Sequence, residues 1–122
     1  MTNIDIMLNN LNKSKFRSSF HLRKYMISYI EDKGLDVIKK HAYDFIKNRI
    51  APHNILNDGH QTPMKGHLVF IAQHATATCC RNCIYKWYHI ERNRMLTEEE
   101  INYFVNIIMK WIEKEYKRGL DE

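Results

Sequence analysis

The chain has 122 residues, of which 44% are apolar and 27% are charged, the usual composition of a globular domain. This composition excludes a disordered or fibrous protein, and no stretch approaches the roughly 18 consecutive apolar residues of a membrane span. No basic segment followed by an apolar block opens the chain, so we expect no secretory signal. The three cysteines lie within five positions, which suits thiolates in the cytoplasm better than a disulfide framework.

The net charge of +5 is unevenly spread. Ten Lys and Arg stand against five Asp and Glu in residues 1–50, five against two in residues 51–95, and four against seven in residues 96–122. A basic surface over the first two thirds can attract nucleic acid or a phosphorylated ligand. A well-solvated surface explains the same charges, because no segment is a dense basic run. A nucleic-acid-binding module is therefore an alternative function.

The chain contains only four glycines and two prolines, which predicts an all-α fold of about five helices in a single compact domain over residues 1–122. The first predicted helix is short and amphipathic, and we expect residues 1–15 to be a loosely attached N-terminal segment. A helical hairpin follows. Its first helix lies around Tyr25 to Asp32, Gly34 separates the two, and the second helix carries an apolar stripe from Val37 to Ile46.

A loop of about 14 residues is predicted between Pro52 and Gly66, because this stretch contains Asn-Asp-Gly and Thr-Pro and has no apolar periodicity. A loop of this length in a compact domain is usually functional. Next come a short helix over 67–76, a break at 76–78 and a helix from Cys79 or Cys80 to about Tyr88.

The C-terminal helix has the strongest signal in the sequence. Thr97 and Glu100 have the spacing of a capping box, and Gly119 is expected to end the helix. Between them, apolar residues recur at steps of three and four. This stripe consists of Ile101, Phe104, Val105, Ile108, Trp111 and Ile112. We expect it to form the main core helix.

The segment from His67 to Cys83 gathers side chains that bind metals. Residues seven apart on a helix lie on nearly the same face, so His67 and His74 are expected to point the same way, about 10 Å apart. Cys80 and Cys83 have the Cys-x-x-Cys spacing that lets two thiolates bind one metal ion, or that activates a thiol at a helix start. The predicted metal ligands are His67, His74, Cys79, Cys80 and Cys83, with Asp58 and His60 as further candidates from the loop.

Zinc is the metal that this set favours, because thiolate and imidazole suit it, and iron is less favoured. Three protein ligands and a water would make a hydrolytic site, whereas four would make a structural one. The cysteines could instead be small apolar core residues. A third interpretation is a metal-free thiol enzyme with Cys79 or Cys80 as nucleophile and His74 as base, in a positive environment supplied by Arg81. The catalytic candidates are His74, Cys79 and Gln73.

Several sequence motifs carry a family resemblance. They are FRSSFHL at Phe16–Leu22, NDGHQTPMKGH at Asn57–His67, VFIAQHATATCCRNC at Val69–Cys83, Lys86–Trp87, and LTEEE with the IMKWI that follows it. Together they resemble a bacterial domain-of-unknown-function family, the one numbered four-one-eight-six, from about Phe16 to Trp111. The resemblance implies that Asn57–Cys83 acts as a unit, and it brings no activity, substrate or cofactor. Leu68 and Tyr88 depart from the family, where Pro and His are expected, and the second departure weakens position 88 as a ligand.

Overall fold

The structure is a computed structural model that describes residues 2–53 and 59–121. Its elements in chain order are α1 (Ile4–Asn12), the 3₁₀ turn η1 (Arg17–Ser19), α2 (Lys24–Lys33), α3 (Leu35–Phe45), the π-helical turn η2 (Ile46–Ile50), α4 (Leu68–Ala75), α5 (Arg81–Tyr88) and α6 (Glu98–Leu120). The described ranges contain no β-strand. The predicted all-α fold is therefore confirmed, with six α-helices in the part of the chain that the structure describes.

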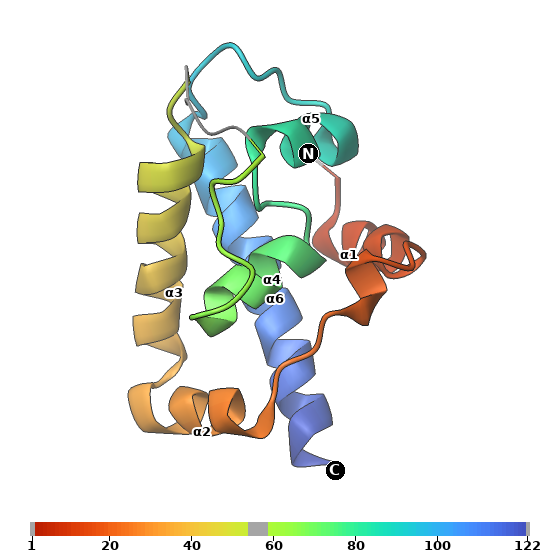
Figure 1. The fold of residues 1–122 in the computed structure, drawn as a ribbon, viewed down its shortest axis with the longest axis vertical. Coiled ribbons are helices and arrows are strands. Elements are labelled where there is room, and N and C mark those ends of the chain that lie inside the picture. Colours follow the sequence, from red (N-terminus) through yellow and green to blue (C-terminus); the bar gives the residue numbers. More distant parts are fainter. Residues whose placement is uncertain (1, 54–58, 122) are drawn as a thin grey trace.

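The long helix α6 is the element on which α1, α2, α3 and α4 all pack (Figure 1). Its start has the predicted capping box, in which Glu100 N–H donates to Thr97 Oγ1 at 3.1 Å and Thr97 N–H donates to Glu100 Oε1 at 2.8 Å. Gly119 does not end the helix, which continues to Leu120. A Cβ at Gly119 would lie only 3.1 Å from the Ile27 side chain, so this glycine lets α2 approach α6 closely.

The predicted hairpin consists of α2 and α3, which contact each other along the chain's lower left side in Figure 1. Gly34 joins them with a φ of 85°, a conformation that favours glycine because it has no Cβ. The hairpin packs against α6 through buried aliphatic residues, among them Ile30 and Ile38. This packing fixes the position of His41, which lies on α3.

The N-terminal helix α1 packs onto α6. Its residues Met7, Leu8 and Leu11 are buried in a small second core with Ala77 and Ile107. Burial of three large apolar side chains stabilises the attachment by several kcal/mol, at about 1.5–3 kcal/mol for each. The segment of residues 4–12 is thus a packed part of the described structure.

The short helices α4 and α5 follow each other across a sharp break. Ala77 has a φ of 58°, which reverses the chain between them. α4 lies across α6, and α5 lies at the upper right of Figure 1, where its Cys83 and Trp87 pack against the small core that α1 forms. Among the described residues, no helix combines the length and apolar character needed to span a bilayer.

Candidate functional site

Cys79, Cys80 and Cys83 bring their sulfur atoms within 4.8 Å of one another at the start of α5. Cys80 is the N-cap of this helix, and its Sγ accepts the Cys83 N–H at 3.3 Å, which holds these two residues one turn apart. Cys79 and Cys80 are buried and Cys83 is half-buried. We refer to the three residues as the cysteine cluster. Within the described ranges it is the one group of three or more His, Cys, Asp or Glu residues gathered closely enough to hold a metal ion.

Arg17 from η1 lies against the cysteine cluster. Its Nη2 donates to Cys83 Sγ at 3.2 Å, and its Nη1 lies 3.7 Å from Cys79 Sγ. The same Nη1 donates to the backbone carbonyl of His74 at 2.7 Å. One guanidinium therefore joins η1 to the end of α4 and to two of the three sulfur atoms.

The contacts give the three thiols different acidities. Hydrogen bonds from Cys79 and Cys80, together with those from Arg17, lower the pKa of Cys83 well below its ordinary value. Hydrogen bonds with Cys80 and Cys83, together with burial, raise the pKa of Cys79. For Cys80 the hydrogen bond with Cys79 favours the thiolate, but the contact with Cys83 and burial outweigh it and raise the pKa. Of the three thiols, Cys83 is therefore the one whose pKa is shifted towards the thiolate.

The positive environment comes from Arg17 and not from Arg81, which the sequence suggested. Arg81 is buried at 2% exposure and donates to the backbone carbonyls of Ala51 at 3.2 Å and Glu91 at 2.6 Å. It ties η2 and the segment before α6 to α5. Sequence reasoning missed Arg17, and its place in the FRSSFHL motif was the one signal that could have found it.

His74 lies next to the cysteine cluster, on the last turn of α4, but it is not part of the group. Its Nε2 lies 3.1 Å from the carbonyl oxygen of Pro63, and because a carbonyl only accepts, Nε2 carries the proton. The ring stacks on Phe20, with 5.7 Å between the centroids. Burial lowers the pKa of His74, so the imidazole is neutral at pH 7.

Gln73 organises the backbone beside the cysteine cluster. Its Nε2 donates to Thr62 Oγ1 and to the Thr78 carbonyl, at 3.2 Å each. Thr62 Oγ1 in turn donates to the carbonyl of Cys79 at 2.8 Å. The loop before α4 is thereby fastened to the residue that carries the first sulfur atom.

The family comparison covers all of these residues. Residues 5–113 match the family model described as a domain of unknown function, DUF4186. The chain belongs to this family. No solved structure is significantly similar to it. The matched DUF4186 region contains both Arg17 and the cysteine cluster, so the arrangement lies inside the family's domain.

His67, the first predicted ligand of this DUF4186 chain, lies at the opposite end of α4. It is the N-cap, with extended backbone, so it does not share a helical face with His74 as predicted. Its Nδ1 accepts the Val69 N–H at 3.0 Å, which leaves the proton on Nε2, and Nε2 lies 3.1 Å from His41 Nδ1. Burial, with a contribution from His41, lowers the pKa of His67 to about 4. The structure does not bring His67 to the cysteines.

The two loop candidates add nothing to the described cluster. Asp58 lies outside the described residues. His60 is described and exposed, and it is not among the residues that group with the cysteines. The observed candidate site therefore consists of three sulfur atoms, with Arg17 beside them and His74 nearby.

Proposed function

We propose that the cysteine cluster binds a transition metal ion, and that the ion is zinc. The observation that supports this is the spacing of the three sulfur atoms, all within 4.8 Å of one another. Thiolates bind zinc at about 2.3 Å in a tetrahedral arrangement, which sets the sulfur atoms roughly 3.8 Å apart. Small side-chain rotations would therefore be enough to close the site on the metal.

Arg17 suits a metal-bound cluster. Three thiolates around Zn²⁺ leave one net negative charge, which a neighbouring guanidinium offsets. Its N–H groups already reach Cys83 Sγ and Cys79 Sγ, and donors of this kind hold thiolate ligands in place and tune the metal. Arg17 would act as an outer partner of the metal.

The fourth metal ligand is a water molecule or His74. Burial favours the neutral imidazole of His74, the form that binds metals, but His74 would have to move to reach the ion, because it is not part of the group. A bound water would make the site hydrolytic, and His74 would close it as a structural site. The His74→Ala variant separates these cases, since it weakens zinc binding only if His74 is a ligand.

Metal analysis of protein purified without a metal-affinity tag tests the proposal. We expect about one equivalent of zinc per chain, and thiolate-to-metal charge-transfer absorption after replacement by cobalt. Cys79→Ser, Cys80→Ser and Cys83→Ser should each weaken binding, while His67→Asn serves as the control that leaves it intact. Less than about a tenth of an equivalent of any transition metal, with no cobalt spectrum, would reject the proposal.

Metal-free thiol chemistry is the second candidate function, and the contact between Arg17 and Cys83 at 3.2 Å favours it. That contact makes Cys83 the nucleophile, in place of Cys79 or Cys80, because a cationic partner stabilises its thiolate. Iodoacetamide should then alkylate Cys83 first at neutral pH in metal-free protein. Equal, slow labelling of all three cysteines would contradict this function.

Nucleic-acid binding remains a prediction that rests on the basic first two thirds of the chain alone. It requires an affinity that falls steeply as salt rises, because phosphate contacts release counterions. Absence of binding to DNA and RNA at low salt would remove it.

A further inference from the structure

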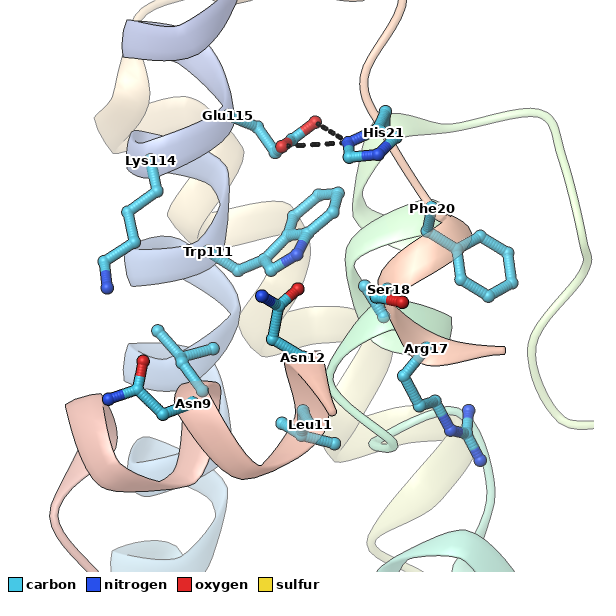
Figure 2. A pocket seen from close by; sticks show the side chains of 12 residues that line it. Asn9, Leu11, Asn12, Arg17, Ser18, Phe20, His21, Trp111, Lys114 and Glu115 are labelled. Atoms are coloured by element: carbon cyan, nitrogen blue, oxygen red, sulfur yellow. Dashed lines mark hydrogen bonds and ion pairs between the residues drawn. The ribbon is translucent and has the colours of Figure 1, made fainter. Parts of the chain in front are cut away.

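A second candidate site is a cavity of about 190 Å³ between α1, η1 and α6 (Figure 2). We call it the α1–α6 cavity. Trp111 forms part of its wall, and Arg17 also borders it, with a guanidinium that points away from Trp111 towards the cysteine cluster. An apolar cavity of roughly 150 Å³ is large enough to bind benzene. The α1–α6 cavity can therefore hold a small ring with one or two substituents.

A buried carboxylate holds a histidine at the edge of this cavity. Glu115 accepts hydrogen bonds from the Leu22 N–H at 2.8 Å and from Arg118 Nε at 3.1 Å, and His21 Nδ1 lies 3.2 Å from its Oε2 (Figure 2). Burial alone would raise the pKa of Glu115, but the bonds with Arg118, Leu22 and His21 outweigh it and lower the pKa. Glu115 is therefore ionised at neutral pH.

The ionised Glu115 determines where His21 carries its proton. A carboxylate only accepts hydrogen bonds, so Nδ1 of His21 must donate, and in the neutral ring the lone pair lies on Nε2. The side chain of His21 is 54% exposed, and its Nε2 has no hydrogen-bond partner among residues 2–53 and 59–121. In the neutral ring, Nε2 of His21 is thus an unused acceptor at the edge of the cavity, and the contact with the buried Glu115 carboxylate orients the ring.

The rest of the lining combines apolar side chains with a few polar ones. Lys114 brings an ammonium group, and its ion pair with Asp5 is exposed, with 3.6 Å between the charged atoms. An exposed pair of this kind is worth about 0–1 kcal/mol, so an incoming anion can replace Asp5. Asn12 adds an amide from α1, and the indole of Trp111 adds an apolar wall (Figure 2).

We propose that the α1–α6 cavity binds a small ring-sized carboxylate that carries a hydroxyl group. The carboxylate pairs with Lys114, the ring packs against Trp111, and the hydroxyl donates to His21 Nε2. Glu115 acts as a positioning residue, because it keeps the lone pair of His21 on Nε2. This site is independent of metal binding by the cysteine cluster, so either proposal can fail without the other.

Three related probes test the proposal on the intact chain: 4-hydroxybenzoate, benzoate, which lacks the hydroxyl, and phenol, which lacks the carboxylate. Binding is followed by the indole N–H resonance of Trp111, which Trp87→Phe assigns because the chain has two tryptophans. We expect 4-hydroxybenzoate to bind about tenfold more tightly than either other probe. No movement of the Trp111 resonance with any of them would overturn the proposal.

Two variants assign the roles. His21→Phe should weaken 4-hydroxybenzoate to the level of benzoate and leave benzoate unchanged. Lys114→Met should weaken both carboxylates and leave phenol unchanged, whereas Lys110→Met, one turn earlier on the same helix, should change nothing. Equal losses for all probes in a variant that keeps the helical circular dichroism of the unchanged chain would contradict these roles.

The tautomer of His21 provides a test that needs no variant and no ligand. The ¹⁵N shifts of its ring nitrogens should show the proton on Nδ1 of the neutral imidazole. A proton on Nε2 would remove the acceptor from the cavity and overturn the proposal, even if a probe bound elsewhere.

Discussion

Two different groups of potential metal ligands lie near the two ends of α4, cysteines just beyond its C-terminal end and histidines at its N-terminal end. Beyond its C-terminal end, at the start of α5, three sulfur atoms lie within 4.8 Å of one another, and Arg17 contacts two of them. At its N-terminal end, both ring nitrogens of His67 already have partners, the Val69 N–H and His41 Nδ1. The cysteines could hold a metal ion, whereas His67 serves as a helix cap.

The difference shows that the type of a side chain does not make it a ligand. A metal ion needs lone pairs that point to one place and accept no hydrogen bond. In His67, one ring nitrogen accepts a hydrogen bond and the other donates one. The rings of Tyr29, Phe45 and Phe70 also surround His67, which adds to the cost of charging or moving it. Four experiments test this difference between the cysteines and His67.

Removal of the proposed metal should give the largest effect. A ligand that binds only the native state, present at a thousand times its Kd, adds about 4 kcal/mol to the free energy of unfolding. A chelator should therefore lower the unfolding temperature by roughly 10–20 °C, measured by calorimetry. Cys80→Ser should abolish this difference and His67→Asn should preserve it. Identical unfolding temperatures before and after chelation would contradict metal binding by the cysteine cluster.

Substitution of Arg17 by Leu should give the next largest effect. The carbonyl of His74 and the sulfur atoms of Cys79 and Cys83 would lose their charged donor. We expect the free energy of unfolding to fall by about 2–3 kcal/mol, and zinc affinity to fall about tenfold or more. Denaturant titration and competition with a zinc indicator measure the two quantities. The control is Arg23→Leu, because Arg23 is exposed. Equal losses of stability and zinc affinity in this variant would mean that only the positive charge matters, and not the contacts of Arg17.

The pH dependence of stability should report on the histidine end. The pKa of folded His67 is about 4, below the value of roughly 6.5 for an unfolded histidine. The stability contributed by neutral His67 is therefore complete above pH 6.5 and is lost as the pH falls towards 4. Urea midpoints of metal-free protein should show this loss. The variant His67→Asn keeps a capping acceptor without titrating, so it should lose less, and a parallel decline of both proteins would contradict the assigned role.

Substitution of Thr97 by Ala should give the smallest effect and serves as a reference away from both ends. It removes one half of the capping box of α6, which is worth about 1 kcal/mol. Urea denaturation should detect this loss, and zinc content should not change. A change in zinc content would mean that the cysteine cluster depends on how α6 begins.

Local features of the fold were readable from the sequence. Thr97 and Glu100 bond across three positions, and Gly34 alone permits the turn between α2 and α3, so neighbouring residues determine both features. The family was predicted from short motifs, and the grouping of Cys80 with Cys83 was predicted from their Cys-x-x-Cys spacing. Both signals are local in the sequence. The partners that decide the site were not, because Arg17 lies 66 positions from Cys83 and His41 lies 26 positions from His67. Contacts over such separations depend on how η1 and α3 pack against α4, which no local pattern encodes.

The cysteine cluster contains every sulfhydryl group of the chain. Any internal disulfide must therefore join two of these three residues, which would leave a single thiol where a zinc ion needs three. If the cluster binds zinc as proposed, oxidation and metal retention exclude each other at this site. A bound ion would shield the sulfur atoms from oxidants, and an oxidant strong enough to cross-link them would release the ion.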